Sequence, residues 1–214
     1  EMYFNGADFP IDTDVSESEF DPTILKSKKI KRLIDAQADF MVGNAPEIKV
    51  TCVSDPESCD NQSSIQSYLD AVLKANNFPA KLIRGARDCF IGGRVFLKVN
   101  VLPDKITLMF ISADNFVYET QPDDVDVLSR VVLFYCVRET DDRSEQRWWR
   151  QRYRMESGKC YVTEDLYDGY GNIIPGYGTE ERDTGLGCIP GCVILNEGLS
   201  GDTEGESDVE MLMH

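Results

Sequence analysis

The segment best suited to chemistry is a run of arginine and aromatic residues at 146–155 (QRWWRQRYRM). If this run forms a strand, alternation of side chains places four residues on one face: Trp148, Arg150, Arg152 and Arg154. Aromatic rings stack on bases and guanidinium groups pair with phosphates, so the three arginines are candidate nucleic-acid contacts. Alternatively, arginine stems cover apolar surface and their heads pair with carboxylates. We favour this alternative because 38 acidic residues outnumber 22 basic ones.

The remaining chemical groups of the chain do not form a catalytic pattern. The acidic groups at 123–126 and 141–142 lack calcium-loop spacing and accompanying histidines, so we interpret them as turn residues. The glycines at 85, 92 and 93 lack the lysine and hydroxyl of a phosphate-binding loop. The only histidine, His214, excludes histidine-based triads. We therefore predict no catalytic residue, no cofactor and no metal site, and a protein that is not an enzyme.

The seven cysteines are an odd number and are scattered along the chain. That distribution fits reduced thiols in a cytosol better than the disulfide framework of a secreted protein. Cys188 and Cys192 are close together, but a zinc site needs a second pair of cysteines or histidines.

The net charge of −16 limits the kinds of partner. Phosphate binding needs clustered Lys and Arg, so strong free-standing affinity for nucleic acid is disfavoured. A negatively charged wall along which DNA slides remains compatible with this charge. No apolar run approaches the ~20 residues of a membrane helix, and no signal peptide opens the sequence. The chain begins at Glu1 and ends within a predicted helix, so we expect a piece of a longer protein.

Residues 1–20 are acidic and indicate an extended arm or a segment bound by a partner. A first helix is predicted from Asp21-Pro22, an N-cap followed by proline, to Val42. We expect Gly43 to form a left-handed C-cap and Pro46 to prevent continuation. The first half of this helix is crowded with basic residues, which suit either phosphate contact or a solvated, ion-paired face; we favour the latter. They are Lys26, Lys28, Lys29, Lys31 and Arg32.

Two further helices and an antiparallel meander are predicted. A short strand at 47–53 precedes a helix at 64–76 with an apolar stripe, and a third helix runs from Pro79 to Gly92-Gly93. Period-two alternation and turn residues then predict strands at 95–101, 106–111, 116–119, 130–138, 146–155, 159–164 and 193–195, and a long exposed loop at 167–187. The apolar strand at 130–138 is expected to be buried on both faces and to pack under the helices. The residues expected to do so are either Val132, Phe134 and Cys136 or their alternates Val131, Leu133, Tyr135 and Val137. The fold class is α+β.

Three patterns spread over the chain resemble one known family. A helix runs into Gly43 and Pro46, and a second helix leads through Gly92 into a strand. The third pattern is Gly-Cys-Ile-Pro at 187–190, a strand ending in Asn196, and Ser-Asp-Val-Glu at 207–210. In this order they resemble the N-terminal half of tailed-bacteriophage portal proteins of the SPP1-like family. The residues that carry the resemblance are Gly43, Pro46, Gly92, Gly187, Pro190, Asn196, Ser207 and Asp208. Two residues separate Gly43 from Pro46, more than is usual in that family.

The resemblance implies a structural subunit of a ring, commonly dodecameric, at one vertex of a phage or prophage capsid in the virion. Double-stranded DNA would pass through the ring during genome packaging and ejection. Partners would be further copies of the chain, the terminase motor, capsid or scaffold proteins and head-completion proteins, without a membrane. The family's DNA-channel and terminase contacts would lie beyond residue 214.

On this interpretation, residues 1–20 form an acidic arm, residues 21–196 a wing-like α+β domain, and residues 197–214 an acidic linker and the start of a helix that leads to the stem and clip. Two alternatives stay open. One is another virion head–tail connector protein. The other is a nucleic-acid-binding domain that uses the Arg/Trp hairpin at 146–155.

Overall fold

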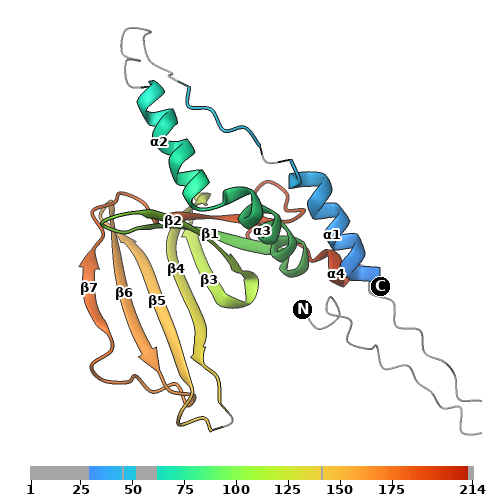
Figure 1. The fold of residues 1–214 in the computed structure, drawn as a ribbon. Coiled ribbons are helices and arrows are strands. Elements are labelled where there is room, and N and C mark those ends of the chain that lie inside the picture. Colours follow the sequence, from blue (N-terminus) through green and yellow to red (C-terminus); the bar gives the residue numbers. More distant parts are fainter. Residues whose placement is uncertain (1–28, 45, 52–61, 141, 212–214) are drawn as a thin grey trace, which may run out of the picture.

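The computed structural model describes residues 29–44, 46–51, 62–140 and 142–211. Within these ranges the chain forms an α+β fold, as predicted (Figure 1). The helices are α1 (Lys29–Val42), α2 (Gln62–Ala75), α3 (Phe78–Gly92) and α4 (Asp208–Met211), with a short 3₁₀ helix at Ala113–Asn115. The strands are β1 (Arg94–Val101), β2 (Ile106–Ser112), β3 (Phe116–Gln121), β4 (Asp124–Arg138), β5 (Arg147–Glu156), β6 (Lys159–Tyr167), β7 (Thr179–Asp183) and β8 (Gly191–Leu195). The expected arm at 1–20 and the helix start at Asp21-Pro22 lie outside the described residues.

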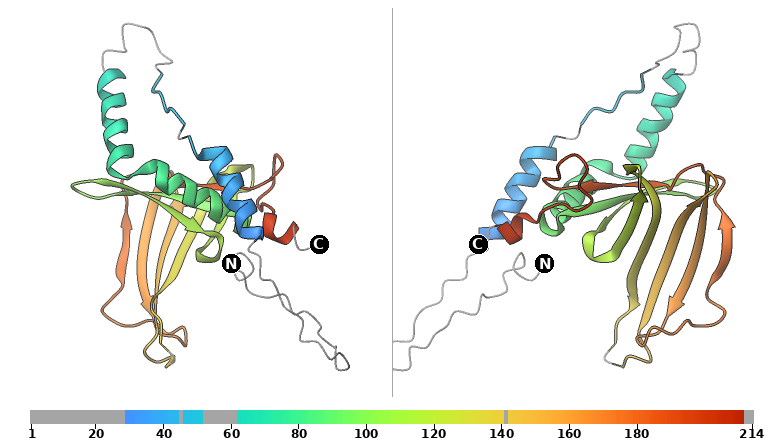
Figure 2. Two further views of the ribbon diagram at one scale, coloured as in Figure 1. Left: turned by 45° about the vertical axis from the view of Figure 1, so that its right-hand side comes forward. Right: turned by 180° about the vertical axis from the view of Figure 1, so that it is seen from behind.

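The strands form two antiparallel sheets rather than one meander. A five-stranded sheet follows chain order, β3-β4-β5-β6-β7, and a three-stranded sheet has the order β2-β1-β8. The sheets face each other, with the helices on the other side of the smaller sheet (Figures 1 and 2). The main core lies between the sheets and consists of Phe96, Phe116, Val131, Leu133, Tyr153, Cys160, Val162 and Ile189.

Strand β1 is the central strand of the smaller sheet and is covered on both faces. Phe96 points into the core between the sheets. On the opposite face Leu97 lies beside Phe110 of β2, against which α3 packs. A Cβ on Gly85 would lie 2.4 Å from the Phe110 ring, so glycine permits the close approach of α3.

The apolar strand β4 does not pack beneath the first helix, and that part of the prediction is wrong. Val131 and Leu133 are fully buried, but they face the smaller sheet, because β4 belongs to the five-stranded sheet. Phe134 points to the outer face, where it is only half-buried beside Arg150 of β5. The sequence marked the strand as apolar without showing that only its inward face is covered.

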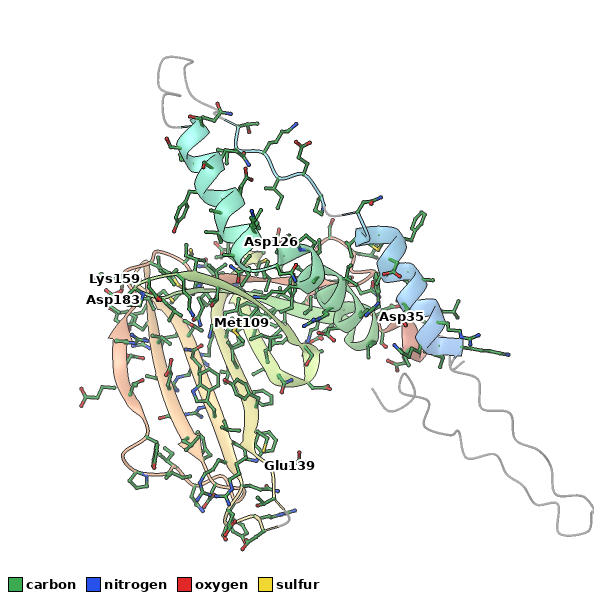
Figure 3. All side chains as sticks on the ribbon, viewed as in Figure 1. Asp35, Met109, Asp126, Glu139, Lys159 and Asp183 are labelled. Atoms are coloured by element: carbon green, nitrogen blue, oxygen red, sulfur yellow. The ribbon has the colours of Figure 1, made fainter. Side chains whose placement is uncertain are left out.

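A second, smaller core joins α1, α3 and α4. It contains Ile34 and Ala38 from α1, Phe90 from α3 and Val209 from α4. An ion pair adds to the helix contact, since Arg87 of α3 lies 2.9 Å from a carboxylate oxygen of Asp35 on α1 (Figure 3).

The predicted left-handed cap at Gly43 is wrong, because Gly43 does not have a positive φ. Its N–H instead donates to the Asp39 carbonyl at 2.9 Å and continues the helical pattern. A left-handed cap occurs instead at the end of α3, where Gly93 has a φ of 74°.

Helix α2 extends away from the body of the molecule and contains no buried residue, contrary to the core role that its apolar stripe indicated (Figure 1). The expected strand at 47–53 is also wrong: residues 46–51, which we call the strap, pair with no strand. Glutamine side chains of α2 replace strand pairing. Gln66 accepts a hydrogen bond from Val50 N at 2.7 Å, and Gln62 donates to Val50 O at 2.6 Å.

The free edge of β2 is closed by side chains that follow α2. Asn76 donates to Ile106 O and accepts from Leu108 N, at 2.9 and 2.8 Å. Lys81 donates to Leu108 O at 2.6 Å. These bonds occupy backbone groups with which another strand would otherwise pair.

The long loop predicted at 167–187 contains β7, which pairs with β6 at the edge of the larger sheet. Lys159 and Asp183 form an ion pair at 3.3 Å at this edge (Figure 3). No helix within the described ranges is long and apolar enough to cross a membrane.

Candidate functional site

The three candidate arginines lie on the outer face of the five-stranded sheet, as the alternation predicted. Arg150 pairs with Asp165 of β6 at 2.7 Å and lies over the Tyr167 ring. Arg154 donates from Nε and Nη2 to the two carboxylate oxygens of Glu181 on β7, at 2.6 and 2.5 Å. The interpretation that the arginine heads meet carboxylates is therefore confirmed for these two residues. These hydrogen bonds hold the pKa of the Glu181 carboxyl below its usual range.

Arg152 differs from its two neighbours. It forms no ion pair with a carboxylate among the described residues, and its buried Nε has no hydrogen-bond partner there. Trp148 on the same face is 38% exposed. This pair is what remains of the predicted stacking and phosphate-binding surface.

A second group of predicted residues meets at one junction. There the end of α3, the end of β8 and the start of α4 come together, although α3 and α4 are separated by more than 100 residues. Asn196 donates its backbone N–H to Gly93 O at 2.8 Å, and its carbonyl accepts from Glu206 N at 2.9 Å. The Asn196 side-chain amide donates to Glu206 O at 2.8 Å and to Asp208 Oδ1.

Ser207 completes the junction. Its hydroxyl donates to Ile91 O at the end of α3 at 2.6 Å, and it accepts from Glu210 N at 3.3 Å. The second bond caps α4, because Ser207 satisfies an N–H of the first turn. Asp208 is only 7% exposed, and its Oδ2 has no hydrogen-bond partner in the described part of the chain. The junction thus fixes the start of α4 against the ends of α3 and β8.

Not all predicted motif residues join this junction. Gly92 is exposed beside it, and a Cβ there would lie 2.8 Å from Ala113 Cβ. The segment containing Gly187 and Pro190 lies at the opposite end of β8 from Asn196, where Pro190 O accepts from Val99 N of β1 at 2.9 Å. Gly43 and Pro46 lie apart from both groups, at the exposed end of α1 and in the strap.

The sequence did not predict a buried lysine between the sheets. Lys98 is 4% exposed and donates to Gln151 Oε1, and Gln151 in turn donates to Glu164. Its ammonium lies 5.7 Å from the ring centres of both Trp149 and Tyr153. Burial lowers the pKa of the Lys98 ammonium to about 8, against an opposing effect of the Glu164 charge. A signal was present, because Lys98 shares a strand face with the core residue Phe96.

Lys98 borders a cavity of about 420 Å³ between the sheets. The hydrogen bond, the two aromatic rings and the nearby Glu164 carboxylate compensate its charge, so a structural role accounts for its burial.

The other groups considered for chemistry have structural surroundings. Asp142 accepts from Ser144 N at 2.8 Å in a turn, as predicted, while Asp141 lies outside the described residues. Burial, with the charges of Asp208 and Asp88, raises the pKa of the Cys89 thiol to about 11, which keeps it protonated. Among the described residues no group of His, Cys, Asp or Glu could hold a metal ion. The cysteines there are free thiols: Cys89, Cys136, Cys160, Cys188 and Cys192.

No model of a known protein family matches the chain, and no curated protein matches it.

Proposed function

We propose that this chain is the wing region of a portal subunit from a tailed bacteriophage or prophage. Copies would form a ring at one capsid vertex through which double-stranded DNA enters during packaging and leaves during ejection. The role is structural rather than catalytic. The terminase motor, capsid or scaffold proteins and head-completion proteins are the proposed partners, and the assembled virion is the proposed location.

The observation that carries the proposal is the junction at Asn196. In sequence, Gly92 belongs to the second pattern that resembles the portal family, and Asn196 and the Ser207-Asp208 pair belong to the third. In space the latter two are hydrogen-bonded, and Ser207 also bonds the last turn of α3. These contacts position α4 rather than a reactive group, which supports a structural role for the patterns.

The experiment is to image the full-length protein by negative-stain electron microscopy and to measure its mass by light scattering. Annular particles with one repeated subunit contact are expected, because heterologous contacts that close by rotation form rings. A protein that stays monomeric across protein concentration and salt would overturn the proposal.

A nucleic-acid-binding domain is the second candidate, favoured by Arg152 and the partly exposed Trp148. Its test is binding of a short duplex and of a single strand of the same length at physiological salt. A dissociation constant on the order of 10⁻⁸ M or tighter, typical of specific complexes, would favour this candidate over the portal.

A further inference from the structure

We propose that the cavity between the two sheets binds a small aromatic anion. Lys98 and Arg182 supply the positive charge of this site, and the rings of Trp149 and Tyr135 supply an apolar wall. The cavity has a volume of about 420 Å³, within the roughly 300–1,000 Å³ of typical ligand sites. A small-molecule site of this kind goes beyond the proposed function and does not depend on it.

The Lys98 ammonium has hydrogen-bonding capacity that the protein leaves unused. An ammonium has three N–H donors, and the one acceptor that Lys98 has among the described residues is Gln151 Oε1. Burial lowers the pKa of Lys98 to about 8, so most of the amine is still protonated at neutral pH. Because charged donors bind charged acceptors most strongly, an anion suits the two remaining N–H groups best.

Arg182 of β7 is a second cation at the same cavity. The strand register places Arg182 opposite Val162 of β6, and Val162 opposite Tyr153 of β5, so the three side chains share the inner face of the larger sheet. The ring centre of Tyr153 lies 5.7 Å from the Lys98 ammonium, so both cations lie near this tyrosine. Arg182 forms no ion pair within the described ranges.

The charge around the cavity is positive, although the chain has a net charge of −16. The charged residues in the lining are Lys98, Arg182, Glu164 and Asp183. Both carboxylates already have partners: Gln151 donates to Glu164 at 2.6 Å, and Lys159 lies 3.3 Å from Asp183 (Figure 3). With Lys159 included, three cations surround two carboxylates. The lining therefore favours an anion over a cation or a neutral molecule.

The rest of the cavity suits a flat apolar group. On the larger sheet the rings of Trp149 and Tyr135 lie side by side, with their centres 4.8 Å apart. Trp149 also contacts the Lys98 ammonium, so this aromatic surface begins beside the charge. Met109 and Leu102 from the β1–β2 hairpin line the cavity as well, although they are 42% and 39% exposed. Apolar walls with a few polar groups are typical of small-molecule sites.

The test is binding of naphthalene-2-sulfonate to the full-length protein, measured by isothermal titration calorimetry. A dissociation constant on the order of 10⁻⁵–10⁻⁴ M is expected for a probe with about 14 non-hydrogen atoms. Naphthalene-2-sulfonamide has the same rings without the charge and should bind at least tenfold more weakly. Quenching of tryptophan fluorescence should follow the calorimetric titration, because Trp149 lines the cavity.

Two variants test the cations separately. Lys98→Met should weaken binding of the sulfonate about tenfold or more, because it removes a buried charged donor. Arg182→Gln should weaken it about threefold or more, since an exposed charge contributes less. The matched control is Lys74→Met, the same change at an exposed lysine of α2 outside the cavity, which should bind like the wild type. Thermal melting checks that each variant folds, and Arg182→Gln decides alone if Lys98→Met does not fold.

Three results would overturn the site. Without saturable binding below about 1 mM, the cavity would hold no such ligand. Equal affinity for the sulfonate and the sulfonamide would show that the two cations play no part. Unchanged affinity in both Lys98→Met and Arg182→Gln would show that the probe binds to another surface of the protein.

Discussion

Replacing Asn196 by alanine removes the side-chain amide that holds the junction of α3, β8 and α4. The change leaves the two backbone hydrogen bonds of residue 196 possible, because these do not involve the side chain. It removes the donor to Glu206 O at 2.8 Å and the donor to Asp208 Oδ1. Among the described residues, this amide is the one hydrogen-bond donor to the Asp208 carboxylate.

The expected loss follows from the two bonds. A neutral hydrogen bond contributes about 1 kcal/mol to stability, and a bond to a charged group contributes about 1.5–3 kcal/mol. The cost of losing the second bond lies at the upper end of its range when the charged acceptor is buried and left without a partner. The Asp208 carboxylate, only 7% exposed, would be left in that position. We expect Asn196→Ala to lower the free energy of unfolding by about 3–4 kcal/mol. For a domain of this size that corresponds to a fall in melting temperature of roughly 6–15 °C.

The assay is urea unfolding followed by two signals. Far-UV circular dichroism reports on the whole fold, and tryptophan fluorescence reports on Trp148 and Trp149 in β5, because these are the two tryptophans of the chain. Coincident transitions would show that the junction unfolds together with the larger sheet. The double variant with Asp208→Ala should be less unstable than the sum of the single changes by about 1–3 kcal/mol, because it removes the unpaired carboxylate.

A matched control exists on the surface of the same molecule. Asn172 donates to Asp168 at 3.0 Å with the same pair of groups, but this bond is exposed to solvent. Asn172→Ala should change the free energy of unfolding by less than about 1 kcal/mol, since water replaces the lost bond. If Asn196→Ala and Asn172→Ala have equal effects, the junction is not held by its amide–carboxylate pair and the reasoning is refuted.

Three further predictions concern the core and the outer sheet face. Burial lowers the pKa of Lys98 from 10.5 to about 8, so between these pH values the unfolded chain binds more protons than the folded one, and stability from this group rises with pH. Urea titration measures the difference in free energy of unfolding between the wild type and Lys98→Met. This difference should therefore increase in favour of the wild type by about 2–3 kcal/mol from about pH 7 to about pH 10. A difference that does not change with pH would contradict the burial effect. Leu133→Ala should lower the free energy of unfolding by about 2–5 kcal/mol. Val137→Ala, at a site 58% exposed on the same strand, should change it by less than about 1 kcal/mol. Similar losses for the two variants would show that the core was placed incorrectly. In fluorescence anisotropy with a short duplex at physiological salt, binding should be no tighter than about 10⁻⁶ M, and Arg152→Gln should weaken it more than Arg150→Gln, because Arg150 is already paired with a carboxylate.

The local elements of the fold could be predicted from the sequence because they depend on local pattern. Alternation at 95–101 and proline with glycine at the ends of α3 gave β1 and α3 within a few residues of their observed bounds. The division into two sheets could not be predicted in the same way. It depends on the pairing of Phe96 with Val193, residues about 100 positions apart whose register no local pattern specifies.

For the candidate site, too, the sequence predicted the local arrangement of the side chains but not their distant partners. Alternation placed Arg150, Arg152 and Arg154 on one face, and the acidic composition indicated carboxylate partners. The identity of one partner was not predictable, since Glu181 lies on β7 within a segment whose glycines and tyrosines indicated a loop. The junction was visible in sequence only as separate patterns, because the bond between Ser207 and Ile91 joins residues 116 positions apart.

The largest difference between the sequence-based prediction and the structure concerns α2, whose apolar face was expected to be buried and is exposed. Helical periodicity predicts that an apolar face will be buried, but it does not say whether the covering surface belongs to the same chain. Ile34 on α1 and Phe90 on α3 find their partners within the chain. Tyr68 on α2 and Phe40 on α1 do not find them among the described residues. The exposure of Tyr68 and Phe40 therefore shows that the described part of one chain does not supply the surface that their helical pattern predicts.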